Sequence, residues 1–253
     1  MKKILYLFCA LTLVLSSCSS DDASSSSVLI KKIIEKDIDG DDYTVNYTYD
    51  QGNKISEETV QDGASTYKIM YSYDGNLINS ITQVSGEHVD VLTTLTYNAT
   101  NLLAVLVDEM DGKNHYLTKT YYKDNFDGSI SFRKVHIDEV TRAETGLSTG
   151  KLSYTDGNLV KEETTNTSET STIVYEYDTK NNPFKNVLGV EFLLDNAELG
   201  YSKHNKTKET TTSSSGSSLI YSSAFTYDGN DFPTEAKHFD KDGKTEGTTQ
   251  YFY

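Results

Sequence analysis

The sequence predicts an all-β protein, an antiparallel meander of about 16 strands curled into a barrel-like or strongly curved sheet. The first observation is a repeated unit, Tyr-x-Tyr-Asp followed in its clearest copies by Gly-Asn, whose second tyrosine falls at Tyr49 and Tyr73 and, in the looser copy Leu95-Thr96-Tyr97-Asn98, at Tyr97, at intervals of 24 residues. The second is an alternation of apolar with polar residues inside the unit, and the third is a turn signal at both of its ends. A fixed period of this kind indicates one supersecondary unit stacked many times.

Each unit is predicted to be a β-hairpin. Val45, Tyr47 and Tyr49 alternate with Thr and Asn, which is the period of a strand with one half-buried face. A tight turn, a second apolar run and another turn such as Asp62-Gly63 lead into the next unit. The tyrosines of the repeat, called the repeat tyrosines below, should face inward, pack across strands and offer contacts to a ligand: Tyr47, Tyr49, Tyr71, Tyr73, Tyr97, Tyr154, Tyr175, Tyr177 and Tyr227.

Strict alternation, continued past the turns, predicts which side chains share a face. Ile55, Glu57 and Thr59 should lie together, on the face of Tyr49. Between residues 159 and 165, both faces should carry charge. Because a membrane-spanning strand keeps about 9–11 residues apolar toward lipid, this pattern favours a barrel in water over a membrane pore.

The first 17 residues are predicted to be a cleaved signal peptide, with a basic start at Lys2-Lys3 and an apolar run too short to span a bilayer. Leu15-Ser16-Ser17-Cys18 resembles the lipobox of bacterial lipoproteins, which implies lipidation of Cys18; the alternative is an ordinary signal peptide with an incidental cysteine. Asp21-Asp22 is similar to the acidic tether of lipoproteins sent to the cell surface, so we expect outer-membrane anchoring on that side, with the periplasmic side as the alternative.

Two further regions complete the expected organisation. Residues 18–27 form a Ser- and Asp-rich tether, and residues 28–253 form one repeat-built β domain. Within that domain the segment near 183–199 breaks the repeat, because Pro183 opens it and Val187, Leu188 and Leu194 suit a helical stripe. We expect a long connection with one short helical or irregular stretch that caps an end of the sheet. A buried pair of strands is the alternative.

Charge and cysteine content limit the partners and the covalent chemistry. The chain carries a net charge of −15, and loss of Lys2 and Lys3 with the signal peptide lowers it by two, to −17. Such a chain is repelled by nucleic acid, so no nucleic-acid partner is expected. Removal of Cys9 and lipidation of Cys18 would leave no disulfide. We expect a monomer held by packing and strand pairing.

About 16 strands exceed what an open twisted sheet usually holds. The sheet should therefore curl, and either enclose a wet lumen or flatten until its walls meet. Tyrosine is abundant and tryptophan is absent. An amphipathic inner face, with phenol hydroxyls meeting polar groups or water, is the natural consequence.

The Tyr-x-Tyr-Asp…Gly-Asn-Leu unit resembles the YD repeats of bacterial Rhs-type shells. The signal, tether, hairpins and the stretch Asn181–Lys185 together more closely resemble uncharacterised lipoproteins described as having a porin-like fold, over nearly all of residues 28–253. The arginine that often precedes the first tyrosine of a YD repeat is missing, since Asn46 and Met70 stand there. The chain is also too short to enclose a toxin domain. The resemblance implies a fold and assigns no active site.

No pattern of catalytic or metal-ligating residues is evident. The five histidines are scattered without the short spacing of a metal pair. Adjacent acidic residues such as Glu162-Glu163 point to opposite faces of a strand, which does not make a catalytic pair. Asp240-Lys241-Asp242-Gly243 lacks the spacing of a calcium loop. We therefore expect no catalytic residue, no metal and no cofactor.

The function predicted from these features is that of a lipid-anchored binding or structural module without catalysis. The repeat tyrosines either serve packing alone or line a concavity for a glycan or a small amphipathic molecule. The alternative is an enzyme acting on an envelope polysaccharide, or a glycan-binding protein with an aromatic-lined cleft. Two carboxylates converging in a deep cleft would favour the enzyme, and a tyrosine-lined lumen without such a pair would favour binding.

Overall fold

The fold is that of a computed structural model, which describes residues 27–253 except 39, 41, 51, 100, 113 and 195–200. The predicted signal peptide and Cys18 lie outside the described residues, as does most of the predicted tether. Strands β1 to β8 span Lys32–Asp37, Asp42–Tyr49, Ile55–Asp62, Ser65–Asp74, Leu77–Ser85, His88–Asn98, Asn101–Asp111 and Asn114–Asp124. Strands β9 to β16 span Ser129–Ile137, Glu144–Thr155, Asn158–Asn166, Thr170–Tyr177, Lys206–Ser213, Ser218–Tyr227, Pro233–Phe239 and Thr245–Phe252.

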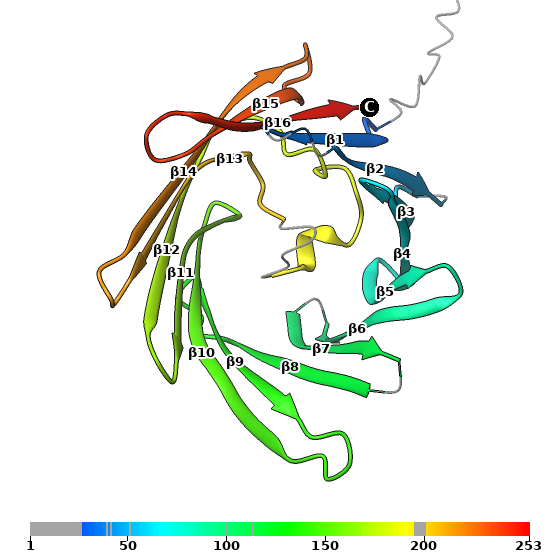
Figure 1. The fold of residues 1–253 in the computed structure, drawn as a ribbon, viewed down its shortest axis with the longest axis vertical. Coiled ribbons are helices and arrows are strands. Elements are labelled where there is room, and N and C mark those ends of the chain that lie inside the picture. Colours follow the sequence, from blue (N-terminus) through cyan, green and yellow to red (C-terminus); the bar gives the residue numbers. More distant parts are fainter. Residues whose placement is uncertain are drawn as a thin grey trace, which may run out of the picture.

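These 16 strands form one closed antiparallel barrel in which each strand pairs with the next along the chain (Figure 1). The ring closes between β1 and β16, where Ile33 stands opposite Tyr251. The predicted all-β meander is confirmed, and the sheet closes fully. Closure satisfies the backbone groups that an open sheet leaves unpaired at its edges.

The strand register shifts by one residue at the second tyrosine of the repeat unit. At the first such shift, Thr48 stands opposite Glu57 but Tyr49 stands opposite Ile55, so Ser56 is an extra residue on β3. A bulge of this kind bends the strand and increases its twist. The shift recurs at Ser72/Tyr73, Thr96/Tyr97, Ser153/Tyr154, Glu176/Tyr177 and Thr226/Tyr227.

The bulges overturn the predicted face of the residues that follow each turn. Ile55 is fully buried and Glu58 is 5% exposed, whereas Glu57 forms an ion pair with Lys68 at 3.0 Å on the outer surface. The prediction that Glu57 shares a face with Ile55 is therefore wrong, because the extra residue reverses the alternation. The predicted charge on both faces of residues 159–165 is present: outward, Lys161 pairs with Glu163 at 2.8 Å, and inward, Glu162 accepts a hydrogen bond from Tyr175.

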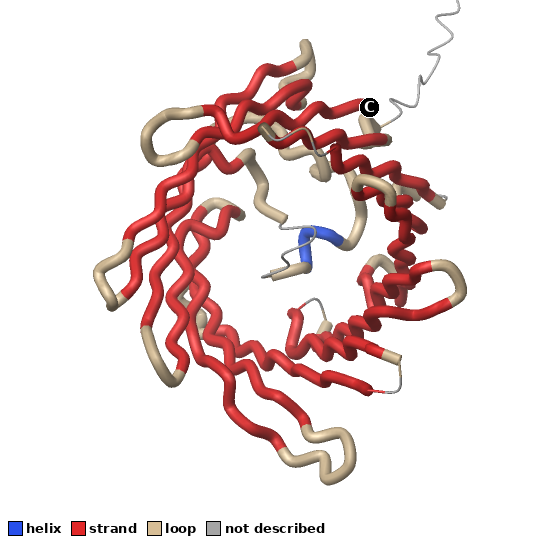
Figure 2. The backbone as a smooth tube through the Cα atoms, in the orientation of Figure 1, coloured by secondary structure: helices blue, strands red, loops and turns tan. Residues whose placement is uncertain are grey.

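The chain between β12 and β13, residues 178–205, is called the internal segment here. Figures 1 and 2 show its described part inside the ring of strands. It contains the only helical element of the described residues, a 3-10 turn at Val190–Phe192. The predicted short helical stretch is confirmed. The alternative of a buried strand pair is wrong, because residues 182–194 form no strand.

The internal segment provides the centre of the hydrophobic core. Val187, Val190 and Leu193 are at most 3% exposed and pack in one cluster with wall residues from β2 to β10, among them Ile55 and Leu152. Its backbone also binds the turns at one end of the barrel, where Leu188 donates to the carbonyl of Asn53 at 3.0 Å. The lumen is thus occupied by chain, and the walls are not pressed together as the flattened alternative required.

Candidate functional site: a cavity beside the internal segment

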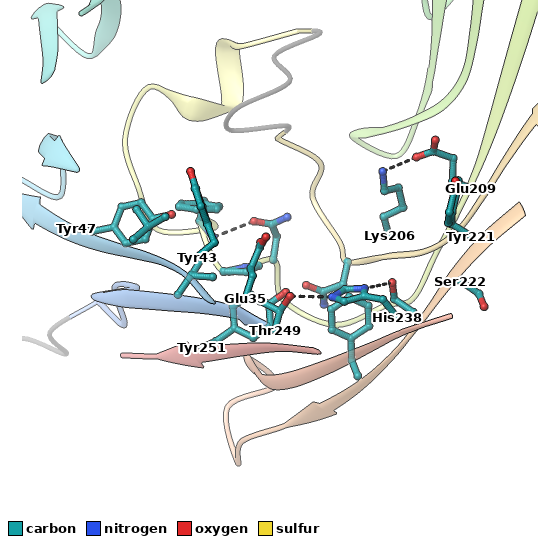
Figure 3. A pocket seen from close by; sticks show the side chains of 18 of the residues that line it. Glu35, Tyr43, Tyr47, Lys206, Glu209, Tyr221, Ser222, His238, Thr249 and Tyr251 are labelled. Carbon is teal, nitrogen blue, oxygen red and sulfur yellow. Dashed lines mark hydrogen bonds and ion pairs between the residues drawn. The ribbon is translucent and has the colours of Figure 1, made fainter. Parts of the chain in front are cut away.

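The inner face of the barrel and one side of the internal segment enclose a cavity of about 760 Å³. Its wall comes from β1 to β4 and from β13 to β16, so the two ends of the chain meet around it. Asn182, Pro183 and Phe184 of the internal segment cover it on the lumen side. Figure 3 shows several side chains of both wall halves directed toward this space.

Tyrosines give the cavity most of its aromatic surface. The hydroxyls of Tyr43 and Tyr67 are 3.3 Å apart, and Tyr47 meets the ring of Phe184 edge-on, with ring centroids 5.5 Å apart. Burial raises the pKa values of Tyr43, Tyr47 and Tyr251 above the ordinary phenol value. These phenols therefore stay protonated at neutral pH and can both donate and accept hydrogen bonds.

Three carboxylates line the cavity, and they differ in their bonding partners. Glu58 accepts a hydrogen bond from the Tyr71 hydroxyl at 2.7 Å, and Glu209 forms an ion pair with Lys206 at 2.7 Å. Glu35 faces the cavity from β1, and burial raises its pKa above the ordinary value. Among the described residues, Glu35 forms no hydrogen bond and no ion pair.

Glu35 and Glu58 are too far apart to act as a glycosidase pair. Glu35 stands opposite Tyr43, and Glu58 stands opposite Tyr47, on the two sides of β2. Four residues along a strand and two strand spacings separate their Cα atoms by about 16 Å. Glycosidases hold their two carboxyl groups about 5–9.5 Å apart, which glutamates at this Cα separation could reach only by pointing at each other, whereas Glu58 is held by the Tyr71 hydroxyl on β4, away from β1. The arrangement that would have favoured a polysaccharide-cleaving enzyme is not made by these two residues.

A hydrogen-bonded chain also crosses the cavity wall. His238 Nδ1 lies 2.9 Å from Ser223 Oγ, and His238 Nε2 lies 2.8 Å from Thr249 Oγ1 (Figure 3). Burial lowers the pKa of His238, which favours the neutral imidazole. All three residues lie within strands paired on both sides, so their backbone N–H groups belong to the ladder. The backbone N–H groups of these three residues therefore cannot form an oxyanion hole for a Ser–His nucleophile.

Most repeat tyrosines hold the structure together. Tyr49, Tyr73 and Tyr177 are partly buried and turned inward, while Thr48 and Ser72 beside the first two are exposed. Five repeat tyrosines donate hydrogen bonds: Tyr49 to the Ile30 carbonyl at 2.6 Å, Tyr71 to Glu58, Tyr175 to Glu162, Tyr177 to the Leu159 carbonyl at 2.7 Å and Tyr227 to Asp178. Tyr97 and Tyr154 pack against the core. Of the nine, Tyr47 lines the large cavity and Tyr154 a smaller one of about 430 Å³.

The cavity also contains tyrosines outside the predicted set. Tyr43, Tyr67, Tyr221 and Tyr251 line it. Tyr43 and Tyr67 lie four residues before Tyr47 and Tyr71, on the same strand face. Continuing the two-residue period toward the start of each strand would have found both. Glu35 carries no sequence signal, because two of its neighbours in the cavity, Thr249 and Tyr251, come from the opposite end of the chain.

The barrel is similar in fold to two solved structures. A porin-like protein from Bacteroides vulgatus aligns with a TM-score of 0.60 and 14% sequence identity, over 89% of this chain and 98% of its own. A porin-like protein from Bacteroides uniformis aligns with a TM-score of 0.53 and 13% identity, over 88% and 97%. The chain has a porin-like fold. At these identities the similarity concerns the fold alone, as the named resemblance implied.

No protein-family model matches the sequence, and no curated protein matches it. Within the described part of this porin-like barrel, no helix is long and apolar enough to cross a membrane. Among the same residues, no three His, Cys, Asp or Glu side chains gather in a way that could hold a metal ion. The candidate site is therefore the tyrosine-lined cavity itself.

Proposed function

We propose that this chain is a non-catalytic binding module that encloses a small amphipathic molecule in the lumen of its barrel. The observation that carries the proposal is the cavity between the internal segment and the tyrosine-lined wall. Its volume of about 760 Å³ lies within the usual range for small-molecule sites, about 300–1,000 Å³. Aromatic faces with a few convergent polar groups are the lining that such sites commonly have.

The inner chemistry supports binding over catalysis. The carboxylates Glu35 and Glu58 are separated by the width of a strand and four residues along it, and Glu209 is neutralised by Lys206. The phenols of the cavity are protonated and present both hydroxyls and ring faces. Such a surface suits an amphipathic guest, including a glycan, without transforming it.

The proposal places the barrel in water, attached to the outer membrane through lipid on Cys18 and exposed on the cell surface. Support for the aqueous location comes from the outer face, where ion pairs occur all round the ring. Glu57 with Lys68, Arg133 with Glu144 and Glu176 with Lys208 lie on β3–β4, β9–β10 and β12–β13. A charge at the midplane of a bilayer costs up to about 2–4 kcal/mol on a barrel strand. A pore would incur this cost on several strands.

The test is a screen of the purified full chain against a glycan array and a panel of small amphipathic molecules. A ligand of the cavity should lose at least about tenfold in affinity when Tyr43→Ala removes a lining ring. Tyr121→Ala is the matched control, because Tyr121 lies on the outer surface beside Arg133 and Glu144. Saturable binding that both variants weaken equally, or no binding in either panel, contradicts the proposal. Turnover of a polysaccharide would favour the enzyme.

A further inference from the structure

We propose that the barrel stands on the membrane with the end closed by the internal segment toward the lipid, so that its large cavity opens away from the bilayer. This inference rests on the membrane attachment and the binding role proposed above, and it adds the direction from which a ligand enters. Two independent observations carry it: which end of the barrel is closed, and at which end the chain enters the wall.

The internal segment closes one end of the barrel, called the sealed end here. Because neighbouring strands are antiparallel, the turns that precede β3, β11 and β15 all lie at this end, and the segment itself begins and ends there. These three turns are distributed round the ring. The backbone of the segment donates a hydrogen bond to each of them: Leu188 to Asn53 at 3.0 Å, Lys203 to Gly157 at 3.1 Å and Asn181 to Asp231 at 3.0 Å.

Burial of the inner wall distinguishes the two ends. At the sealed end, Ile55, Ile78 and Pro233 lie at or next to the start of β3, β5 and β15, and each is less than 2% exposed. The other end is called the open end. There, Leu219 and Tyr221 near the start of β14 share the inner face, yet they are 52% and 43% exposed. Because Tyr221 lines the large cavity, solvent reaches that cavity from the open end.

The chain enters the wall at the sealed end. The residues just before β1 bond to the turn that precedes β3 and to the internal segment. The side chain of Asn53 donates to Ser27 Oγ at 2.6 Å, and the side chain of Asn186 donates to the carbonyl of Val28 at 2.9 Å. These bonds hold Ser27 and Val28 at the sealed end, so the connection to Cys18 starts from this end.

The length of that connection limits how the barrel can stand. Ser27 follows Cys18 by nine residues (27 − 18), which reach at most about 32 Å when fully extended. The wall is about 23 Å high, since a ten-residue strand such as β4 is about 31 Å long and tilts by about 40°. With the open end on the bilayer, most of the reach would be used in passing the wall. With the sealed end there, no extension is needed, so chain entropy favours this orientation.

Single-cysteine variants of the lipidated full chain locate both ends relative to the bilayer. Gly229→Cys and Phe126→Cys lie in turns of the sealed end, and Ala64→Cys and Val140→Cys lie in turns of the open end. All four positions are exposed. Each variant carries a fluorophore and is bound to phosphatidylcholine vesicles with an acceptor dye on some headgroups. Energy transfer should quench the sealed-end labels at least about twofold more, because the ends differ in height by about 23 Å.

Leu219→Cys tests whether the mouth of the cavity is free, with Gly229→Cys as the matched control. The reagent is a membrane-impermeant polyethylene glycol maleimide, and the reference is the same variant in a Cys18→Ala chain in solution. Attachment to vesicles should leave the modification rate of Leu219→Cys unchanged. It should slow that of Gly229→Cys at least about threefold, because the bilayer restricts access to the thiol. Equal slowing of both overturns the orientation.

The remaining outcomes separate the proposals. The unmodified chain should take up no label, because Cys9 leaves with the signal peptide and Cys18 is lipidated; labelling, or failure to bind vesicles, contradicts the anchor and the orientation together. Stronger quenching at Ala64→Cys and Val140→Cys, or no difference between the ends, overturns the orientation alone. So does strong quenching confined to Gly229→Cys and Ala64→Cys, which flank β1, since the barrel would then lie on its side. The expected quenching without any ligand in the screen contradicts only the binding function.

Discussion

Gly189 of the internal segment lies directly against Asn76, in the turn between β4 and β5. A Cβ atom at Gly189 would stand 2.8 Å from the Asn76 carbonyl oxygen and 3.1 Å from Cγ1 of Ile78. The backbone of Gly189 also has φ of +93°, a conformation that residues with a side chain rarely adopt. A side chain at this position would therefore strain the seating of the segment against the turn.

Gly189→Ala should destabilise the barrel by about 1–3 kcal/mol, because it adds strain at positive φ and a close contact with backbone. Urea unfolding followed by circular dichroism measures the change. Gly229→Ala is the matched control, since a Cβ there meets nothing within 4 Å, and it should stay within about 0.5 kcal/mol of the unmodified chain. Equal changes in the free energy of unfolding of both variants would contradict the close contact of Gly189 with this turn.

Tyr73→Ala should cost about 2–4 kcal/mol, because the ring packs against the core and beside Gly189. Ser72→Ala, on the exposed side of the same strand, should change stability by less than about 0.5 kcal/mol. The two urea midpoints make the comparison. If they move equally, the inward register of the repeat tyrosines is wrong.

Glu35→Gln should stabilise the protein slightly at neutral pH, because Glu35 is exposed to solvent and solvent screens most of the cost of its charge. Burial raises the pKa of Glu35 in the fold above its ordinary value of 4.5, so the native state binds the proton more tightly than the unfolded state. The stability of the unmodified chain is then fully expressed below pH 4.5 and is reduced as pH rises through the raised pKa. The advantage of the variant should accordingly be absent below that value and grow above it.

Melting temperatures of the two proteins between pH 4 and pH 8 provide the measurement. The groups nearest Glu35 are Tyr43 and Tyr47 on β2 and Tyr251 on β16, and His238 on β15, whose pKa is lowered by burial, is present in both proteins, so that its titration cancels in their difference. The tyrosines remain protonated throughout this range, so they do not produce a competing transition. A variant that is less stable than the parent at pH 8 would show that Glu35 has a structural partner.

Cys18→Ala should prevent lipidation and release the mature chain from the membrane fraction, as the Leu15-Ser16-Ser17-Cys18 motif predicts. Detergent phase separation followed by immunoblotting distinguishes the two forms. The unmodified chain should enter the detergent phase, and the variant the aqueous phase. Identical partitioning would remove the lipoprotein prediction.

Residues 28–253, produced without the signal or Cys18, should form a monomer in detergent-free buffer and conduct no ions in planar bilayers. The physical reason is the charge on the outer face, for example the ion pair of Lys161 with Glu163. Light scattering and bilayer recordings measure both properties. Aggregation relieved by detergent, together with stepwise conductance, would instead identify a pore.

The repeat made the barrel predictable, because tyrosines at a fixed interval and turns between alternating residues specify hairpins. The number of strands required the sheet to curl, but it did not decide between a strongly curved sheet and the closed barrel that the structure shows. The faces after each turn were not predictable from alternation, since extra residues such as Ser56 reverse the inward and outward positions. Glu58 was therefore missed as an inward carboxylate.

The cavity was predictable only in part. Tyr47 was identified, and Tyr43 and Tyr67 follow from the same period on the same strands. The surroundings of Glu35 depend on the pairing of β1 with β16, because Thr249 and Tyr251 come from the far end of the chain. Pairing of the first strand with the last leaves no local trace in the sequence around either strand.

The internal segment also limits how the size of this barrel can change. Gain or loss of one repeat unit would change the circumference by two strands, whereas the chain that fills the lumen has a fixed cross-section. Close contacts such as that of Gly189 with Asn76 can form only when the barrel has one particular circumference. Duplication or deletion of a unit, the easiest genetic change in a repetitive chain, would therefore have to be matched by a new filling. Contacts between the internal segment and the wall therefore favour a constant number of hairpins.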